Sequence, residues 1–454
     1  MTTPRHADLL LRGGTVVTPG GAERIDVACS GGRIVALGDL AGSWSAGTVL
    51  DATGLHVLPG AIDSQVHFRE PGLVHKENLE AGTRGAVLGG VTAVFEMPNT
   101  QPLTLDAADL QAKLDAARGR AWCDHAFYIG GSAVNAEQLA ALENLPGCAG
   151  VKVFMGSSFG DLLADEDDVL RRILRHGRRR LAVHAEDEAR LRERKALVQA
   201  CGDVRRHPEW RDVESALRAT RRIVALAAEA GRRLHVLHVS TAEEMDFLAV
   251  HRHRVTVEVT PHHLSLHAPD CYERLGSLAQ MNPPVRSQHH QDALWQAIRE
   301  GVVDVVGSDH APHTLQEKAR PYPQSPSGMT GVQTLLPLML DHLHAGRLSL
   351  QRLVDLTSAG PARIFGIAGK GRIAVGYDAD FSIVDLKARR AIRNEWIASV
   401  SGWTPYDGLA VTGWPIHTVV RGRCVVRDEA LSGPPMGQPL AFLDSSPAHG
   451  APHD

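Results

Sequence analysis

Residues 57–72 read VLPGAIDSQVHFREPG, and this stretch does most to decide the fold. The apolar run 57–62 leads directly into polar residues, among them Gln65, His67 and Arg69. A buried strand with such an ending is typical of an enzyme barrel, where catalytic side chains follow the parallel strands. His67 offers a ring nitrogen to a metal ion, and Arg69 offers paired donors to an anion. The stretch therefore predicts a strand that ends at an active site.

Seven further short apolar runs follow, separated by longer amphipathic segments. The eight runs are residues 57–62, 91–97, 125–129, 151–155, 181–184, 234–239, 255–259 and 302–307. Apolar positions recur at helical spacing in residues 76–88, 110–117, 214–229, 242–250 and 291–300. This alternation is typical of βα units around a parallel sheet. The sequence therefore predicts an α/β protein with a (β/α)8 barrel of the TIM type.

The two ends of the chain carry a different pattern. Residues 1–55 and 369–430 contain short alternating runs punctuated by Gly and Asp, which is typical of antiparallel strands. We expect both segments to build one small β-sandwich domain beside a barrel of residues 56–368. Residues 431–454 are rich in Pro, Gly and Ser, and we expect a C-terminal arm or tail there.

The composition excludes several classes of protein. With 454 residues and 43% hydrophobic side chains, the chain can bury a large core. Its net charge of -4 gives no bulk attraction to nucleic acid or to an anionic membrane. The six cysteines form no C-x-x-C pair, and no apolar run approaches the roughly 20 residues that span a bilayer. Since no signal-like stretch opens the chain, we expect a cytoplasmic protein without nucleic-acid or membrane partners.

Side chains that can do chemistry lie at the ends of the predicted strands or within them. They are Gln65, His67, Arg69, Asn99, Lys152, His184, His238, Asp309, His310 and His313. A barrel brings the carboxyl ends of its strands together, so we expect these side chains to converge. A single histidine there is more often a hydrogen-bonded core residue than a ligand, but the ordered set on several strands favours a metal site. Imidazole and carboxylate groups suit Zn²⁺.

Lys152 is the sharpest single candidate. It lies within the apolar run 151–155, where an ammonium group is costly to bury. Burial would depress its pKa, and the neutral amine could then react with CO₂. The resulting carboxylated lysine would bridge two metal ions as a carboxylate does. His235, His262 and His263 lack comparable support, and we expect structural or supporting roles for them.

Seven segments resemble the dihydroorotases. They are residues 63–72, 96–100, 150–155, 184–186, 238–241, 281–286 and 307–313. Dihydroorotases belong to the amidohydrolase superfamily, close to the hydantoinases and allantoinases. Residues 371–373 and 376–380 also resemble the closing β-domain of that superfamily, so the likeness covers residues 7 to about 430.

The resemblance implies two metal sites that share a carboxylated lysine. The more exposed metal of the family is held by that lysine and two later histidines, which match Lys152, His184 and His238. The buried metal is held by a His-x-His pair, the lysine and an aspartate, and here the matching residues are Gln65, His67, Lys152 and Asp309. Because Gln65 replaces the first histidine, it is a weak or lost ligand. We expect one tightly bound Zn²⁺ and a second that is weak or absent.

The resemblance also implies the reaction, which is reversible hydrolysis of the cyclic amide of L-dihydroorotate to N-carbamoyl-L-aspartate in pyrimidine synthesis. Asp309 would take a proton from the attacking hydroxide and deliver it to the departing ring nitrogen. Arg69 and Asn99 match the positions that hold the ring carboxylate. Asn282 and His313 match further substrate contacts. Gln280 differs from the lysine common at its position, and residues 314–327 are expected to form a surface loop near the pocket mouth.

Two alternatives stay open. The first is another cyclic amidohydrolase, such as an allantoinase or hydantoinase, against which the acid-binding pair Arg69 and Asn99 argues. The second is an inactive homologue that serves as a structural partner of aspartate carbamoyltransferase. Only Gln65 departs from the ligand pattern, which disfavours that second alternative. The expected ligand is a small molecule with a carboxylate, and a homodimer is expected because the family often forms one.

Overall fold

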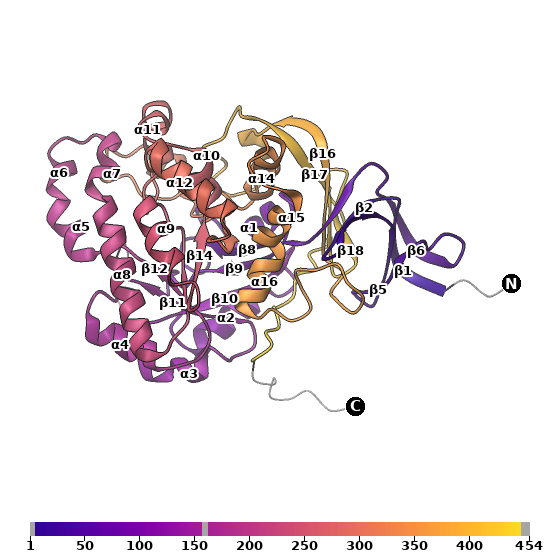
Figure 1. The fold of residues 1–454 in the computed structure, drawn as a ribbon, viewed down its shortest axis with the longest axis horizontal. Coiled ribbons are helices and arrows are strands. Elements are labelled where there is room, and N and C mark those ends of the chain that lie inside the picture. Colours follow the sequence, from indigo (N-terminus) through magenta and orange to yellow (C-terminus); the bar gives the residue numbers. More distant parts are fainter. Residues whose placement is uncertain (1–4, 157–161, 446–454) are drawn as a thin grey trace.

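The computed structural model describes residues 5–156 and 162–445, and its centre is a parallel barrel (Figure 1). Eight strands lie in sequence order in one sheet: β8 (Ala61–Val66), β9 (Val91–Glu96), β10 (Asp124–Gly130), β11 (Cys148–Phe154), β12 (Leu181–His184), β13 (Leu234–Val236), β14 (Val255–Val259) and β15 (Val305–Val306). A parallel bridge from Val66 to His310 joins the first strand to the chain beyond the last. The predicted (β/α)8 barrel is confirmed.

The start of the first barrel strand differs from the prediction. The run 57–62 is not one strand, because β7 (His56–Pro59) belongs to another sheet and β8 begins only at Ala61. Gly60 lies between them, where an added Cβ would come within 2.1 Å of the Thr92 hydroxyl oxygen. The chain therefore passes from one sheet to the other at a position that only glycine fits.

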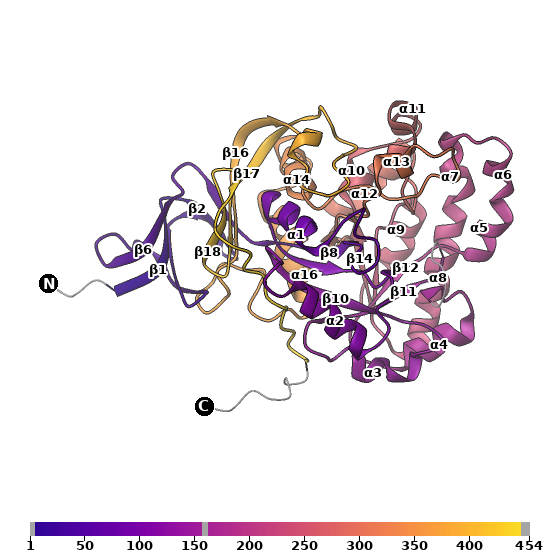
Figure 2. The ribbon, with the colours of Figure 1, turned by 180° about the vertical axis from the view of Figure 1, so that it is seen from behind.

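Helices cover the outside of the barrel (Figures 1 and 2). The longer ones are α1 (Leu79–Leu88), α2 (Ala107–Ala117), α4 (Asp167–Arg175), α8 (Val213–Ala230), α9 (Ala242–Ala249), α12 (Gln288–Arg299) and α14 (Leu335–His344). The short ones are α3 (Leu139–Leu142), α5 (Glu188–Arg194), α6 (Ala196–Gln199), α7 (His207–Trp210), α10 (Pro261–Ser265), α11 (Asp270–Leu275), α13 (Leu315–Lys318), α15 (Leu350–Val354) and α16 (Gly360–Phe365). The predicted helix 76–88 starts at Leu79 because the Asn78 side chain accepts a hydrogen bond from the backbone N–H of Ala81. Within the described ranges, no helix is long and apolar enough to cross a membrane.

Both ends of the chain contribute to two further sheets beside the barrel (Figure 2). The four-stranded sheet has the order β5 (Arg33–Gly38), β4 (Asp26–Ser30), β1 (Arg5–Arg12), β6 (Trp44–Asp51). The seven-stranded sheet has the order β19 (Ala430–Leu431), β18 (Arg423–Arg427), β17 (Ala410–Val420), β16 (Phe381–Ala391), β7, β2 (Thr15–Thr18), β3 (Gly21–Arg24). Leu9, Val27, Val57 and Phe381 lie in the apolar core of these sheets, which thus joins residues from both termini.

A buried ion cluster ties these sheets to the barrel. The Lys370 ammonium lies 2.6 Å from Asp124 and 3.2 Å from Asp378, and it also contacts Asp380. Arg421 adds a second cation, 2.9 Å from Asp124. The three carboxylates are close enough together to hold a metal ion, but each already pairs with a cation, Lys370, Arg421 or the more exposed Arg33. We therefore interpret this cluster as a set of structural ion pairs between the sheets and the barrel, not as a metal site.

The C-terminal segment lies against the end of the barrel where the strands begin. The backbone N–H of Gly437 donates to Ala121, and that of Leu440 donates to His125 at the start of β10. The Phe442 ring meets the Phe95 ring edge to face, with centroids 5.8 Å apart. This segment covers the end of the barrel where the strands begin. The carboxyl ends of the strands lie at the other end of the barrel, and access to them is from there.

Candidate active site

The strand ends of the barrel bring the predicted metal ligands together. His184 ends β12, Lys152 lies within β11, and His67, His238 and Asp309 follow β8, β13 and β15. All five side chains are buried. His67 Nε2 is 3.2 Å from Asp309 Oδ1, and His184 Nδ1 is 3.0 Å from His238 Nε2. Burial lowers the pKa of His238 well below its usual value, and the neighbouring His184, Lys152 and His67 lower it further. The five residues therefore share one site.

His184 is held by a carboxylate that the sequence analysis did not single out. The Nε2–H of His184 donates to Glu186 Oε2 over 2.8 Å, which leaves the Nδ1 lone pair facing His238. Glu186 in turn accepts from Arg211, whose Nε lies 3.0 Å from Oε1. Burial alone would raise the pKa of Glu186, but Arg211 and His184 outweigh it and lower the pKa to about 2. A permanently charged carboxylate behind an imidazole is the usual support of a metal-binding histidine.

Lys152 is a buried amine without a counter-charge. In the described part of the chain its Nζ has no hydrogen-bond partner, and it lies 4.4 Å from the centre of the Phe154 ring. Burial lowers the pKa of Lys152 to about 7, although Asp309 and Glu258 oppose the shift. A substantial share of the side chain is therefore the neutral amine at neutral pH, which is the form that reacts with CO₂.

Gln65 and His67 flank the carboxylate of Asp309. The Gln65 amide Nε2 donates to Asp309 Oδ1 over 2.9 Å, whereas its Oε1 has no partner among the described residues. His67 Nδ1 lies 2.7 Å from the Asn99 amide oxygen and donates to it. Burial lowers the pKa of His67, so the neutral ring turns its Nε2 lone pair toward Asp309. A ring nitrogen and a carboxylate oxygen at this distance are favourable partners only with a proton or a metal ion between them.

These observations fit a divalent metal ion. The donor atoms come in two close pairs, His67 with Asp309 and His184 with His238, and the buried Lys152 Nζ and Gln65 Oε1 have no partner among the described residues. Buried polar groups are otherwise nearly always paired, so a cluster of unpaired ones indicates a missing group. The donor types suit Zn²⁺ and similar ions. The residues at the strand ends could therefore hold a metal ion.

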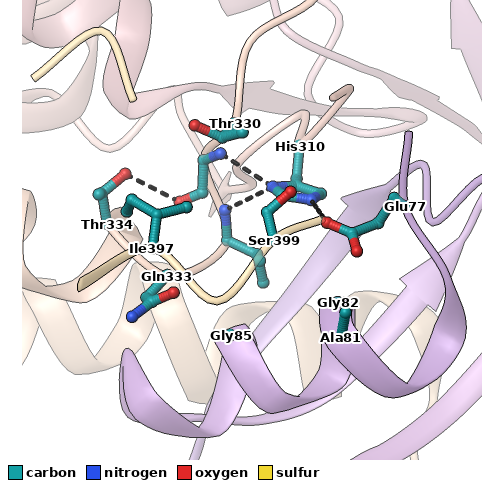
Figure 3. A pocket seen from close by; sticks show the side chains of 12 residues that line it. Glu77, Ala81, Gly82, Gly85, His310, Thr330, Gln333, Thr334, Ile397 and Ser399 are labelled. Carbon is teal, nitrogen blue, oxygen red and sulfur yellow. Dashed lines mark hydrogen bonds and ion pairs between the residues drawn. The ribbon is translucent and has the colours of Figure 1, made fainter. Parts of the chain in front are cut away.

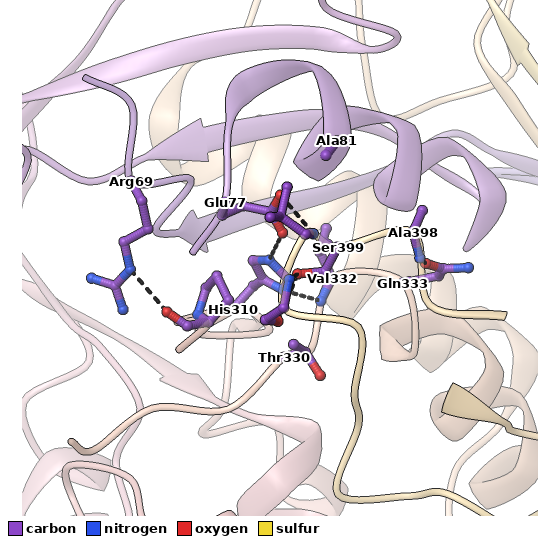
Figure 4. A network of polar contacts seen from close by, with 12 residues as sticks. Arg69, Glu77, Ala81, His310, Thr330, Val332, Gln333, Ala398 and Ser399 are labelled. Carbon is purple, nitrogen blue, oxygen red and sulfur yellow. Dashed lines mark hydrogen bonds and ion pairs between the residues drawn. The ribbon is translucent and has the colours of Figure 1, made fainter. Parts of the chain in front are cut away.

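Arg69, Lys76 and the neutral His313 form a wall beside the candidate metal ligands, and Arg69 and Lys76 give it positive charge. Arg69 Nε donates to the Pro312 carbonyl over 3.3 Å (Figure 4), and Nη2 lies 3.4 Å from His313 Nε2. Burial lowers the pKa of Arg69 to about 10, so the group stays charged at neutral pH. His313 Nδ1 lies 3.2 Å from the Lys76 ammonium, a residue that no sequence motif marked. The pKa of His313 is depressed by burial and by Arg69, Lys76 and Lys318. This wall favours an anion.

Asn282 and His310 have other partners. The Asn282 amide oxygen accepts from His207 Nε2 over 3.0 Å. His310 Nε2 lies 3.2 Å from Glu77, and its Nδ1 accepts from the backbone N–H of Gly331 over 3.0 Å (Figures 3 and 4). The small cavity beside His310, of about 10 Å³, has room for about one water molecule (Figure 3). His310 thus fixes the backbone next to Asp309, whose φ is +48°, and its ring forms no part of the ligand set.

Comparison with known proteins identifies the family. Residues 56–425 match the profile of the Amidohydrolase family, and the chain belongs to that family. It is 36% identical over 418 residues to a dihydroorotase of Methanosarcina mazei, covering 89% of this chain and 91% of the relative. It is 38% identical over 444 residues to an allantoinase of Rubrobacter xylanophilus, covering 94% and 96%. An L-hydantoinase of Arthrobacter aurescens superposes with a TM-score of 0.90 at 30% identity, covering 96% and 99%.

These relatives confirm the predicted class of enzyme. The chain is a hydrolase of the carbon–nitrogen bond in cyclic amides, and its resemblance to the dihydroorotases holds over most of its length. Dihydroorotases, allantoinases and hydantoinases are similar to it at comparable identity. The choice among their substrates therefore depends on the residues around the site.

Proposed function

We propose that this protein is a dihydroorotase, which hydrolyses the cyclic amide of L-dihydroorotate reversibly to N-carbamoyl-L-aspartate in pyrimidine synthesis. One observation carries the proposal. Arg69 is only 7% exposed, and no carboxylate among the described residues lies within ion-pair distance of it. The nearby acids have other partners, since Glu70 pairs with Arg120 and Glu77 with His310. A buried guanidinium without a counter-ion is costly, and the ring carboxylate of the substrate would supply the missing charge.

Replacing Arg69 tests this choice of substrate. In Arg69→Met, kcat/KM for L-dihydroorotate should fall by about 30-fold or more, because charged hydrogen bonds of about 2 kcal/mol are lost. Turnover of a neutral hydantoin, if measurable, should not fall. Arg118→Met serves as control, since that exposed arginine forms a surface ion pair with Asp115 on α2. Equal losses on acidic and neutral substrates would contradict the carboxylate role.

Asn99 and the metal ligands complete the proposed site. Because the Asn99 oxygen accepts from His67, its amide NH₂ is the part left to meet a substrate carboxylate. Lys152, His184 and His238 would hold the tightly bound ion, with Lys152 carboxylated and zinc as the proposed metal. Bound there, a zinc ion supplies a polarised ring carbonyl and a bound water whose pKa falls from about 15.7 toward about 7.

Asp309 is the proposed proton carrier. Its Oδ1 is engaged by Gln65 and His67, so we assign the proton transfer to Oδ2. That oxygen would take the proton of the attacking water and return it to the ring nitrogen as the carbon–nitrogen bond breaks. Gln65 keeps the carboxylate in place through its N–H, and its unpartnered Oε1 is a weaker metal ligand than an imidazole nitrogen. We therefore propose that the second metal is weakly bound or absent.

The carboxylate behind His184 offers an independent test of the metal site. Glu186→Gln should weaken zinc binding by about 10- to 100-fold, because the uncharged amide no longer supports the His184 ring. Competition with a chelator on purified protein measures this affinity. The matched control is Glu193→Gln, which changes an exposed glutamate close by in the sequence. Unchanged affinity in Glu186→Gln would show that His184 does not depend on this partner.

An allantoinase is the second candidate, because an allantoinase relative matches at 38% identity over nearly the whole chain. Allantoin has no charged group that could pair with Arg69, so its hydrolysis would leave the guanidinium without a counter-ion. An inactive partner of aspartate carbamoyltransferase would have no use for the buried set of Lys152, His184, His238 and Asp309. Homodimer formation and a cytoplasmic location stay predictions.

A further inference from the structure

The loop of residues 314–328, which follows His313, is anchored by a buried lysine. Lys318 is 1% exposed and lies at the end of α13. Its ammonium donates to the carbonyl oxygens of Gln280, Pro326 and Gly328 over 3.2, 2.9 and 3.1 Å. No carboxylate of residues 5–156 or 162–445 lies within ion-pair distance of it. The ammonium also contacts the Trp403 ring, whose centre lies 5.7 Å from Nζ. Burying an ammonium group without a carboxylate partner is costly, and the three carbonyl contacts offset that cost only while the loop keeps this conformation.

Gln280 binds the returning half of the same loop. Its amide Nε2 donates to the Ser325 carbonyl over 2.9 Å and to the Ser327 hydroxyl over 3.1 Å. Its Oε1 accepts from the Ser325 hydroxyl over 2.7 Å, and its backbone carbonyl accepts from the Gly328 N–H over 2.9 Å. A lysine at this position could not accept from Ser325. The structure thus gives a physical reason for the glutamine that sequence analysis left unexplained.

The loop held in this way fixes the orientation of His313. The Nε2–H of His313 donates to the Ser327 carbonyl over 3.1 Å. The hydroxyl of the same serine accepts from Gln280, so Gln280 and His313 both bind Ser327. At Gly328 an added Cβ would come within 3.1 Å of the His313 ring, so the loop packs directly on it. At the other end of the loop, Glu317 forms an ion pair of 3.0 Å with Lys76, which also contacts His313. His313 therefore has one orientation only while the loop keeps its conformation.

We propose that Gln280 and Lys318 are positioning residues that hold the 314–328 loop, and through it His313 and Arg69, as a preformed wall for the substrate carboxylate. This inference rests on the proposed dihydroorotase function for its choice of substrate. When the wall is already in place, substrate binding does not have to order the loop and its side chains. Loss of this order should therefore weaken substrate binding and leave the rate of the chemical step unchanged. Neither residue touches the substrate or the reacting atoms in this account.

The test compares Gln280→Met and Lys318→Met with wild type, using Arg320→Ala, an exposed residue of the same loop, as control. In both methionine variants KM for L-dihydroorotate should rise by about tenfold, with kcat within about threefold of wild type. Hydrogen–deuterium exchange of the peptide that spans residues 314–328 should accelerate by about tenfold or more, whereas a distant peptide on α8 should not change. Arg320→Ala should match wild type in both measurements.

Two results would overturn the proposal. One is wild-type exchange in both folded variants, and the other is faster exchange with an unchanged KM. Thermal melting checks folding, and if Lys318→Met does not fold, Gln280→Met still tests the proposal because it leaves the lysine contacts to backbone in place. If wild-type protein does not act on L-dihydroorotate, the proposed function fails. The positioning role is then tested separately, by hydrogen–deuterium exchange of the loop and by KM for the cyclic amide that the protein does hydrolyse.

Discussion

Asp309→Asn is expected to lower kcat for L-dihydroorotate by about 10²- to 10⁴-fold, the usual contribution of a positioned acid–base group. Asparagine has the same shape, and its amide oxygen can still accept from Gln65 Nε2, so the strand end should keep its conformation. It cannot, however, carry a proton from the attacking water to the ring nitrogen. Initial rates at saturating substrate measure the loss, and circular dichroism melting checks the fold.

The control for this variant is Asp292→Asn, which removes the charge of an exposed aspartate on α12. It should leave kcat unchanged. Turnover of Asp309→Asn at the wild-type rate, with the fold intact, would exclude Asp309 as the proton carrier.

Lys370→Met is expected to destabilise the protein by about 3–5 kcal/mol, the typical cost of breaking a buried ion pair from one side. The substitution leaves Asp124, Asp378 and Asp380 buried, with the half-buried Arg421 and the exposed Arg33 as their remaining cations in the described cluster. Urea unfolding of the two proteins at pH 7 measures the difference. Arg33→Ala is the control, because Arg33 meets Asp378 from the exposed surface and should cost at most about 1 kcal/mol.

This destabilisation should depend on pH with a definite sign. In the native cluster, burial would raise the pKa of Asp124, but Lys370 and Arg421 outweigh it and the pKa is lowered. Without Lys370 the carboxyl pKa values rise above those of the unfolded chain, so the folded variant favours the protonated forms. The cost of Lys370→Met should therefore be largest near neutral pH and shrink as the pH falls toward the unfolded value of about 3.9. If Lys370→Met lowered the free energy of unfolding by the same amount at every pH from 4 to 8, the buried carboxylates would not be the cause of the destabilisation.

Much of the fold could be predicted from the sequence because parallel barrel strands are buried on both faces and appear as continuous apolar runs. The boundary between β7 and β8 could not, since Val57, Leu58, Ala61 and Ile62 form one apolar run although they lie in two sheets. The strand pairing in three dimensions and the crowding at Gly60 reveal the crossing. The start of α1 was also missed by three residues, although the Asn78 cap was available as a signal.

Some residues of the candidate site could likewise be predicted from the sequence, and others could not. Lys152, His184, His238 and Asp309 could be predicted because each lies in or just after a recognisable strand and has a side chain that can bind metal or carry a proton. Glu186 was detectable in principle, two residues beyond His184, but its partner Arg211 comes from a separate part of the chain. Lys76 and Lys318 act through contacts across the fold that no local pattern encodes. Gln65 was singled out from the sequence, but its hydrogen bond to Asp309 is visible only in three dimensions.

The most direct test of the account is hydrolysis of L-dihydroorotate by protein purified with zinc and bicarbonate, with zinc per chain counted after dialysis. Gln65→His is assayed in parallel. We expect turnover by the wild-type protein with a single tightly bound zinc, and a second retained zinc in Gln65→His. Absence of L-dihydroorotate turnover in both proteins, or wild-type hydrolysis of allantoin or hydantoin in its place, would contradict the proposed function. Two zinc ions that survive dialysis of the wild type would contradict the role given to Gln65.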